Sequence, residues 1–419
     1  MLGAIADDVT GAVDLASNLV SRGFRTHLHF GVPETLPPAG YSSESADAIV
    51  VALKSRTAPV EDAVGQSLAS LGALLAAGAE RIYVKYCSTF DSTPRGNIGP
   101  VCDAVIERMS ARTAVVVPSF PANGRTLYRG HLFVGDRLLS ESSLAHHPLT
   151  PMTDPDIRRV LASQTAAQVG LLSLETVREG PGAVRAALDT FDEAGVRYVV
   201  VDAIDDHDLT TIATATATDA VITGGSGLAL GMSGPSSHAS LPAPTHLRSG
   251  PGVVLAGSAS EATHIQLARA AAANVPILRL DLDALGEGVQ RARAEAQARF
   301  ATNPESVVIV APAQSPGRVE ATSPDGAARA AALEAAFADL ARGLAGSGIR
   351  RFIVAGGETS GAVVDALGAH DLILGQTIDP GVAWTFTSGT GGRTPVALAL
   401  KSGNFGGPDF FTDAWRRLT

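Results

Sequence analysis

Short apolar runs of β-strand length alternate with helical patterns along most of this chain. AIVVAL at Ala48–Leu53 is a typical run, and the stretches Gly11–Ser21 and Ala63–Ala77 carry apolar residues at steps of three and four. Runs that are apolar on both faces are typical of parallel sheets covered by helices. The alternation therefore predicts an α/β fold with largely parallel sheets. The predicted strands of the first half are Gly3–Ala6, Ala48–Leu53, Arg81–Tyr86, Ala114–Val117, Gly170–Leu172, Tyr198–Val201 and Ala220–Thr223.

A stretch rich in Pro, Ser and Gly interrupts this alternation at Ser233–Gly252. Such a composition offers no apolar face to a core and is typical of a linker. With 419 residues, the chain is longer than one hydrophobic core usually serves. We therefore expect two α/β domains, 1–232 and 253–419, with a linker at 233–252 and a ligand cleft between the domains. The predicted strands of the second half are Val253–Ala256, Ile277–Leu280, Val307–Val310 and Phe352–Ala355.

Two glycine-rich segments in the second half each follow a strand-like run. GGETSG at Gly356–Gly361 follows Arg351–Ala355 and precedes the helical stretch Ala362–Leu367, whereas KSGNFGG at Lys401–Gly407 follows Leu398–Leu400. Glycines let backbone amides approach an anion closely, and a helix N-terminus attracts negative charge. An ordinary tight turn would explain either segment alone. The two together indicate a nucleotide site.

Two further turns of small residues also follow strand-like runs. Gly257–Ser260 precedes a helix predicted at Glu261–Ala272, and Gly224–Gly227 follows the last predicted strand of the first half. The hydroxyls and amides of such turns can cap a helix or hold an anion. The sequence favours neither role.

Lysine is scarce: the 32 basic residues include only Lys54, Lys85 and Lys401. Each follows an apolar run, at the place where open α/β sheets bind ligands. An arginine would serve equally well on a solvated surface, whereas a lysine suits a phosphate or carboxylate approached as a point charge. These three positions are therefore candidate anion contacts.

Polar side chains follow several predicted strands of the first half. Asp7 and Asp8 follow the first strand, where one carboxylate can stabilise the dipole of the next helix and the other can bind a hydroxyl or accept its proton. His146–His147, before Pro148, fits a surface or cap position better than an active site. The remaining candidates for binding a small acidic substrate are Lys54, Arg56, Lys85, Asp91, Asn123 and Arg125.

Several function classes lack their sequence signatures. The chain has no G-x-x-x-x-G-K-[ST] loop and no G-x-G-x-x-G after the first strand, so neither the P-loop nor the dinucleotide fingerprint is present. It also lacks the G-x-S-x-G elbow of serine hydrolases and the H-E-x-x-H metal motif. A nucleotide would need a different kind of site.

Charge and composition limit the classes of partner that the protein is expected to bind. The net charge of −10 argues against nucleic-acid binding, and no apolar run reaches the ~18 residues that a membrane span needs. With two cysteines and no basic, apolar leader at the N-terminus, a cytoplasmic protein is expected. The expected partner is a small-molecule substrate, with no nucleic acid and no membrane, and a homo-oligomer is left open.

Eight segments in order along the chain resemble the four-carbon acid sugar kinase family. They span nearly the whole chain and are weakest around Ser233–Pro251, as expected of a linker. The segments are AIADDVTGAVDLAS, ALKSRTAP, VKYCSTFDSTPRGNIGPV, NGRT, HHPLTPMTD, TGGSGLA, VAGGETSG and ALKSGNFG.

The resemblance implies a division of labour between the domains. In this family the N-terminal domain binds the sugar acid, the C-terminal domain binds ATP, and phosphate moves to the terminal 4-hydroxyl. KYCSTFDST at Lys85–Thr93 is more similar to the branch that acts on 3-oxo-tetronates than to the threonate branch. The ATP contacts of the family fall, motif by motif, on Ser258, Gly357, Glu358, Thr359, Ser360, Gly361, Ala362, Val363 and Gly403.

A mechanistic hypothesis follows for an ATP- and Mg²⁺-dependent transfer, in which the protein mainly positions two anions. Asp7 or Asp8 accepts the proton of the substrate hydroxyl. Arg56 and Lys85 hold the substrate carboxylate, and Lys401 with the GGETSG amides steadies the phosphates. Domain closure would exclude water. Metal ligands are not assigned.

Other functions remain open from the sequence. A D-threonate or D-erythronate 4-kinase of the same family would use the same motifs. A sensor could use the same turns to bind a nucleotide or a sugar acid without catalysis. An aldolase or dehydrogenase would instead need a lysine Schiff base or a dinucleotide fingerprint.

Overall fold

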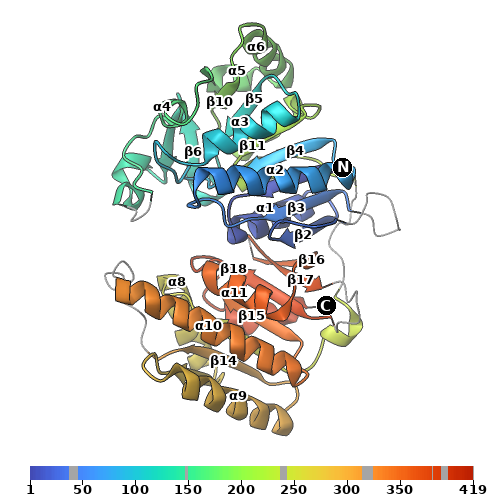
Figure 1. Ribbon diagram of the computed structural model, residues 1–419, viewed down its shortest axis with the longest axis vertical. Coiled ribbons are helices and arrows are strands. Elements are labelled where there is room, and N and C mark those ends of the chain that lie inside the picture. The colour runs from blue at the N-terminus through green and yellow to red at the C-terminus, as the bar shows by residue number, and fades with distance from the viewer. Residues whose placement is uncertain are drawn as a thin grey trace. The chain divides into compact units, whose positions relative to one another are not determined.

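The computed structural model describes residues 1–36, 46–146, 150–235, 243–313, 324–379, 381–387 and 395–418. The chain forms two compact units, Met1–Ala239 and Ser240–Thr419. Each is built on mainly parallel strands flanked by helices (Figure 1). The predicted α/β class with largely parallel sheets is confirmed in both units.

In the first unit the strand order is β2-β3-β1-β4-β11-β5-β10-β9, and all neighbouring pairs are parallel. Each predicted strand is present, with ends that differ by at most one residue. The first strand of the chain thus lies inside the sheet, between β3 and β4. The strands are β1 (Leu2–Ala6), β2 (Thr26–Phe30), β3 (Ala48–Ala52), β4 (Arg81–Lys85), β5 (Ala114–Val117), β9 (Val169–Leu172), β10 (Tyr198–Val201) and β11 (Val221–Gly224).

Capping residues define where several helices of this unit begin. Asp8 caps α1, and Asp205 with Asp208 forms a capping box at the start of α7. None of the helices in the described part of the chain is long and apolar enough to cross a membrane. The helices are α1 (Val9–Ser21), α2 (Val60–Ala76), α3 (Ile98–Arg108), α4 (Ile157–Ala162), α5 (Leu174–Arg178), α6 (Pro181–Glu193) and α7 (Asp206–Ala215).

The structure adds strands that the sequence did not predict. In β2 the residues THLHF are alternately buried and half-buried, so its pattern is less apolar than that of the other strands. A separate antiparallel sheet consists of β6 (Arg125–Tyr128), β7 (His131–Val134) and β8 (Arg137–Leu138). Short strands with polar residues on one face give a weak sequence signal.

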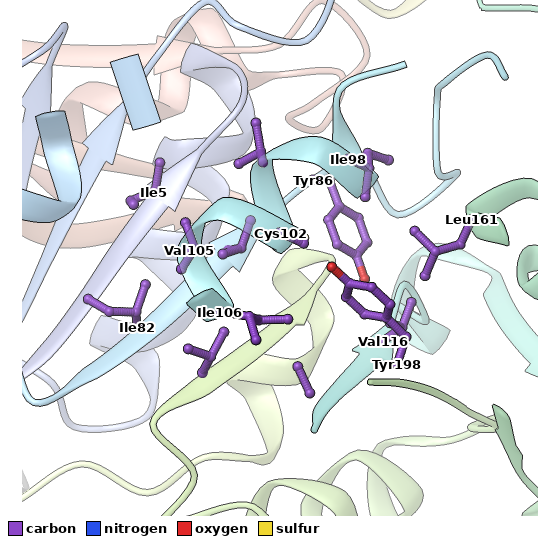
Figure 2. Close-up of a cluster of buried hydrophobic side chains, with 14 of the residues drawn as sticks. Ile5, Ile82, Tyr86, Ile98, Cys102, Val105, Ile106, Val116, Leu161 and Tyr198 are labelled. Atoms are coloured by element: carbon purple, nitrogen blue, oxygen red, sulfur yellow. The ribbon is translucent and has the colours of Figure 1, made fainter. Parts of the chain in front are cut away.

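The core of the first unit fills the space between the parallel sheet and its helices. Figure 2 shows part of it, with Ile106 of α3 beside side chains from the strands. Two tyrosines bury their rings but keep a partner for each hydroxyl: Tyr86 bonds to Thr223 at 3.0 Å, and Tyr198 donates to Asp103 at 2.7 Å. Buried tyrosines are stable when the hydroxyl is satisfied.

The second unit combines a parallel sheet with an antiparallel extension. Strands β13-β14-β12-β15-β18 are parallel, and β17 and β16 continue from β18 as antiparallel neighbours. The last two were not predicted, because their apolar residues are mixed with Gly, Thr and Asp. The strands are β12 (Gly252–Ala256), β13 (Ile277–Leu280), β14 (Val307–Pro312), β15 (Arg351–Ala355), β16 (Asp371–Asp379), β17 (Val382–Thr387) and β18 (Ala397–Lys401).

Long helices cover this sheet. In Figure 1, α10 lies across the face of the sheet turned toward the viewer, and it packs against α9 and α11. One face of α10 is apolar and buried, since Leu333, Phe337, Leu340 and Leu344 all belong to the core. The helices are α8 (Glu261–Ala272), α9 (Leu285–Thr302), α10 (Pro324–Gly346), α11 (Gly357–Leu367) and α12 (Phe410–Asp413).

Part of the predicted linker, 233–252, belongs to the core of the second unit. Ala243 is buried, and Leu247 lies in a short 3-10 helix, η5 (Thr245–Leu247), in the same apolar cluster as Trp384. The interpretation of this stretch as a linker without core contacts is therefore wrong for its second half. Isolated apolar residues among Pro and Ser hold the segment against the unit, which the composition alone did not indicate.

We predict that Ile106→Ala lowers the free energy of unfolding of the first unit by about 2–5 kcal/mol, because it leaves a cavity in a close-packed core. Ile106 is 0% exposed. Val60, which is 37% exposed in the same unit, is the control, and Val60→Ala should change stability by no more than about 0.5 kcal/mol. Equal effects in denaturant titrations would contradict the packing described above.

Candidate functional site

The order of the strands directs the candidate residues of the first unit to one place. From β1 the chain adds β2 and β3 on one side and β4 on the other. Ala6 of β1 is the register partner of Ala52 in β3 and of Lys85 in β4, so these three strands end at one edge. The carboxyl edge at such a reversal is where open α/β sheets bind ligands.

Arg56 joins the two aspartates that follow β1. Its guanidinium donates to Asp7 in a two-pronged pair, from Nε to Oδ2 and from Nη2 to Oδ1, both at 2.9 Å. Nη2 also donates to Asp8 Oδ1 at 2.7 Å. Such bidentate, charge-assisted bonds fix both partners in orientation. The backbone supports this geometry, because the amides of Ser55 and Arg56 donate to the carbonyl of Asp7.

Lys85 is the second cation of this cluster. Its side chain is 4% exposed, and its Nζ lies 3.6 Å from Asp8 Oδ1. The approach needs a glycine at position 11, since a Cβ there would lie 1.9 Å from Lys85 Nζ and 2.2 Å from Asp8 Oδ1. The lysine is thus held next to the first turn of α1.

Asp8 is held in its ionised form. It caps α1 by accepting from the Gly11 amide, and the Thr10 hydroxyl donates to it at 2.8 Å. Burial by itself would raise its pKa, but Arg56, Lys85 and these hydrogen bonds keep the pKa well below the ordinary range of a carboxylate. A carboxylate stabilised in this way is a weak proton acceptor.

A tight turn after β4 brings Asp91 to the same cluster. Phe90 adopts a positive φ of 53°, and its buried ring packs edge-on against Tyr86. Asp91 accepts from Thr89 at 2.6 Å and lies 3.8 Å from Arg56 Nη1. Burial, and to a smaller extent the negative charge of Asp91, raises the pKa of the Cys87 thiol to about 11. This cysteine therefore stays protonated and is no nucleophile at neutral pH.

A small pocket lies beside these residues. Its polar wall includes Asp7, Arg56, Lys85 and Asp91, and apolar side chains such as Val84 close its other side. Asp7 lines this pocket and Asp8 does not. The two aspartates, which the sequence could not rank, therefore occupy different positions.

The structure also identifies residues that the sequence analysis missed. Asn97 donates to the carbonyls of Ser55, Arg56 and Ala58 and so fixes the segment that carries Arg56. Asp14 of α1 is buried, and its Oδ2 accepts from the hydroxyl of Ser226. Neither residue has a sequence signal, because both act through contacts with segments far away in the chain.

Asp14 and Ser226 account for one of the predicted turns. Burial raises the pKa of Asp14, against the hydrogen bond from Ser226 and the charge of Lys85. The turn Gly224–Gly227 leads into the 3-10 helix η4 (Ser226–Gly231), and Ser226 is buried. Its hydroxyl therefore serves the packing of α1 and is not part of an exposed anion site.

Three predicted substrate contacts do not join the cluster. Lys54 is exposed, although it is close to Arg56 in the sequence. Asn123 lies in a 3-10 turn, η1 (Pro121–Asn123), and its carbonyl accepts from the guanidinium of Arg125. Neither Asn123 nor Arg125 lines the pocket beside Asp7. His146 ends a 3-10 helix, η3 (Ser143–His146), and His147 lies outside the described residues.

In the second unit, three neighbouring strands end at one edge and carry the small-residue segments. Register pairs join Ala256 of β12 to Ala355 of β15, and Ala355 to Lys401 of β18. The order β13-β14-β12-β15 places the strand reversal beside β12. The segments after β12, β15 and β18 therefore meet at the same kind of edge as in the first unit.

Within GGETSG, the helix begins earlier than predicted. The helix expected at Ala362–Leu367 starts at Gly357, and Gly356 alone forms the turn, with φ 122° and ψ 135°. Ser360 is buried and its hydroxyl donates to the Gly356 carbonyl at 2.7 Å, while Gly361 and Val363 are also buried. The amides of the first turn of α11 have no acceptor within the helix.

The polar groups at this edge pack closely. Glu358 is exposed, Ala362 is half-buried, and Thr359 is buried, facing the segment after β12. A Cβ at Gly403 would lie 2.2 Å from the hydroxyl oxygen of Ser258, so only glycine fits there. Ser258 is half-buried, and its oxygen accepts from the amide of Ser260.

Lys401 does not line an open site. It is 0% exposed, and its Nζ donates to Thr263 Oγ1 at 3.2 Å and to the Gly403 carbonyl at 3.1 Å. The Nζ also lies 5.8 Å from the ring centre of Phe411. Burial lowers the pKa of Lys401 to about 7. The prediction that Lys401 contacts phosphates directly as a catalytic residue does not fit this position, because the ammonium lies beneath the loop.

Gln266 is a further residue of this loop that the sequence analysis missed. Its side-chain amide donates to the carbonyls of Phe405, Gly406 and Gly407, at 3.1, 2.9 and 3.1 Å. These bonds tie the end of KSGNFGG to α8. A lone glutamine in an amphipathic helix carries no signal of this kind in the sequence.

No metal centre is evident in the described part of the chain, which contains no group of three or more His, Cys, Asp or Glu side chains able to hold an ion. A nucleotide-bound Mg²⁺ needs no such group, since it is held largely by phosphate oxygens and water with one or two carboxylates. The geometry is therefore compatible with a magnesium–nucleotide complex.

Two domain models and several relatives match this chain. Residues 2–232 match the model of a sugar-binding N-terminal domain, and residues 253–411 match that of a nucleotide-binding C-terminal domain. A 3-oxo-tetronate kinase of Cupriavidus necator is 49% identical, over 100% of this chain and 97% of that protein. One of Pseudomonas fluorescens is 48% identical, with the same coverage. A crystal structure from Salmonella typhimurium LT2 is 39% identical, with a TM-score of 0.89 over 100% of this chain and 99% of that chain.

The lowered pKa of Lys401 predicts a pH dependence of stability. The folded pKa is about 7 and the model value for a lysine is 10.5. Between these values the unfolded chain binds the extra proton, so this residue makes stability rise with pH, by at most ~1.4 kcal/mol per pH unit. Denaturant titrations from about pH 7 to about pH 9 should show this slope as the difference between wild type and Lys401→Met. Parallel curves for the two proteins would contradict the assignment.

Proposed function

The chain belongs to the four-carbon acid sugar kinase family, and from this we propose that it transfers the γ-phosphoryl group of ATP to the 4-hydroxyl of a 3-oxo-tetronate. The names of the relatives, 3-oxo-tetronate kinase, support this choice of substrate. We assign the sugar acid to residues 1–232 and the nucleotide to residues 253–419, in keeping with the two domain models.

One observation carries the proposal for the sugar acid. Two cations, Arg56 and Lys85, and three carboxylates, Asp7, Asp8 and Asp91, meet at the carboxyl edge of β1, β3 and β4 beside a pocket. A four-carbon sugar acid has a carboxylate that needs cations and hydroxyls that need acceptors. The cluster supplies both kinds of group within a few ångströms.

We assign the cations to the substrate carboxylate. Arg56 is the more exposed of the two, but it already donates to Asp7 and Asp8. Lys85 has more hydrogen-bonding capacity left, because its ion pair with Asp8 at 3.6 Å is longer than a hydrogen bond. The substrate would share these cations with the aspartates. Asn97 supports the arrangement by fixing the backbone of Arg56.

Asp7 is the better candidate for the proton acceptor. It lines the pocket, whereas Asp8 caps α1 and is stabilised as an anion by four groups. In phosphoryl transfer a carboxylate in this role orients the attacking hydroxyl and accepts its proton. Asp8 then serves as a positioning residue that holds Lys85 and Arg56.

The nucleotide site combines the first turn of α11 with two neighbouring segments. Unpaired amides at a helix N-terminus favour phosphate oxygens. Ser258 and Gly403 lie against one another beside this turn, and Glu358 and Ala362 are the accessible side chains of the helix start. The buried Ser360, Gly361 and Val363 would act by shaping the turn. When bound, Mg²⁺ would neutralise phosphate charge, and Glu358 is the accessible carboxylate of this turn.

A coupled ADP-release assay over 3-oxo-tetronates, threonate and erythronate tests the proposal. A clear preference for a 3-oxo-tetronate is expected. Preference for threonate or erythronate would assign the chain to that activity of the family. Calorimetric binding of ATP with no ADP release from any of these acids would favour a non-catalytic sensor and exclude the kinase proposal.

We predict that Asp7→Asn lowers kcat by about 10²–10⁴-fold, the usual range for loss of a positioned acid or base. Asp8→Asn retains a good helix cap, so it should raise KM for the sugar acid more than it lowers kcat. Both variants keep the shape of the side chain, which limits effects on folding. Wild-type kcat in Asp7→Asn would exclude Asp7 as the proton acceptor. A larger loss of kcat in Asp8→Asn than in Asp7→Asn would assign that role to Asp8.

Gly403→Ala should weaken ADP binding without affecting the sugar-acid site. The added methyl would collide with the Ser258 hydroxyl at 2.2 Å and displace the loop. Gly286→Ala in α9 is the matched control, because a Cβ there meets nothing within 4 Å. Calorimetry should give a Kd for ADP at least about tenfold higher in Gly403→Ala alone. An unchanged Kd would remove this loop from the nucleotide site.

A further inference from the structure

Three donors converge on one backbone carbonyl in the loop after β18. The carbonyl of Gly403 accepts from Ser260 Oγ at 2.6 Å, from Thr263 Oγ1 at 3.1 Å and from Lys401 Nζ at 3.1 Å. Ser260 and Thr263 belong to the start of α8, and Lys401 ends β18. We refer to these three side chains as the Gly403 clasp. A backbone carbonyl oxygen has two lone pairs, so three donors fully satisfy it. The clasp therefore holds this peptide in one orientation.

The orientation has a consequence for the next residue. In a planar trans peptide, the carbonyl and the following N–H point in opposite directions. The Gly403 carbonyl points inward, toward buried Lys401, so the amide N–H of Asn404 points away from the clasp. Asn404 is exposed. The clasp thus presents a backbone donor at the surface of the loop that packs against Ser258.

The clasp also contains a buried cation that has no carboxylate partner in the part of the chain that the structure describes. Among the described residues, burial is the only influence on Lys401, with no charged neighbour acting on it. Its contacts are the Thr263 hydroxyl, the Gly403 carbonyl and the ring of Phe411. The charged and titratable groups on the surrounding elements are Glu261, His264 and Arg269 of α8, Arg351 of β15, Glu358 and Asp365 of α11, and Asp413 of α12.

A buried charge with no counter-charge is costly, and proteins normally pair it. Removing the cost would need only a neutral side chain, yet a lysine, one of three in the chain, occupies the position. An anion bound on the outer side of the Gly403–Asn404 peptide would supply the missing negative charge. The phosphates of a nucleotide have this chemistry.

We propose that Lys401 is a positioning residue for the nucleotide: through the Gly403 carbonyl it turns the Asn404 N–H toward the phosphates, and the phosphates provide its counter-charge. This inference rests on the proposed function, because it needs a nucleotide at this loop. It replaces the direct phosphate contact predicted from the sequence by an indirect role, through the peptide.

Proton uptake on nucleotide binding follows from this arrangement. Without a nucleotide, the pKa of Lys401 is about 7, so the side chain is partly neutral at neutral pH. Phosphate charge nearby raises the pKa and favours the ammonium form. Binding at about pH 7 should therefore take up roughly half a proton at this residue. The proton comes from solvent, and no covalent bond changes.

Titration calorimetry of the full chain with ADP tests the proposal. Measurements at neutral pH in two buffers of different ionisation enthalpy give the number of protons exchanged. Protons lost by ADP itself cancel in the difference between proteins. We expect wild type to take up roughly half a proton more than Lys401→Met, and Lys401→Met to bind ADP about tenfold more weakly.

Two further variants separate positioning from a general loss of structure. Lys401→Arg keeps a permanent charge, so it should retain more affinity than Lys401→Met but show no extra proton uptake. Ser260→Ala removes a different donor of the clasp, and it should weaken binding while keeping the proton uptake of wild type. These patterns would not arise from a merely destabilised loop.

The outcomes distinguish a failure of the proposed role of Lys401 from a failure of the nucleotide site itself. ADP binding to wild type with equal proton uptake in wild type and Lys401→Met, or with equal affinity in both, overturns this inference and leaves the proposed function intact. Absence of ADP binding to wild type overturns the nucleotide site itself. If Lys401→Met does not fold, proton uptake by Lys401→Arg equal to that of wild type overturns the inference.

Discussion

Both candidate sites depend on the parallel register of neighbouring strands. Because Ala6, Ala52 and Lys85 are aligned across β1, β3 and β4, the segments that follow these strands begin at one edge of the sheet. The same holds for β12, β15 and β18 in the second unit. Segments far apart in the sequence are brought together in this way, and each strand can deliver one chemical group.

The two sheet edges carry different kinds of polar group. In the first unit, Arg56 and Lys85 are paired with Asp7, Asp8 and Asp91, so both cations have carboxylate partners before any ligand binds. In the second unit, backbone amides and hydroxyls dominate, and Lys401 is buried beneath its loop.

Much of the fold was predictable because it rests on local pattern. Continuous apolar runs gave β1, β3, β4, β5, β10 and β12, since a strand buried on both faces needs apolar residues at every position. The strands β2, β16 and β17 were missed because polar residues interrupt them. The predicted linker was wrong in its second half because Ala243 and Leu247 reach the core.

The site was predicted only in part. Asp7, Asp8, Arg56, Lys85 and Asp91 follow strands, and the structure brings them together. Lys54 follows the same strand as Arg56 yet is exposed, so its closeness to Arg56 in the sequence did not place it in the cluster. Asn97, Asp14 and Gln266 could not be predicted, since their partners lie in segments far from them in the chain.

The sequence by itself determined the α/β class. It also determined which segments carry charged side chains in the first half and glycine-rich turns in the second half. These features follow from the hydrophobic period and from residue type. Only the tertiary structure decided what each side chain does there. It placed Asp7 at the pocket and Asp8 at a helix cap, and it buried Lys401 under Gly403. Burial and partner identity depend on which strands become neighbours, and no local pattern records that.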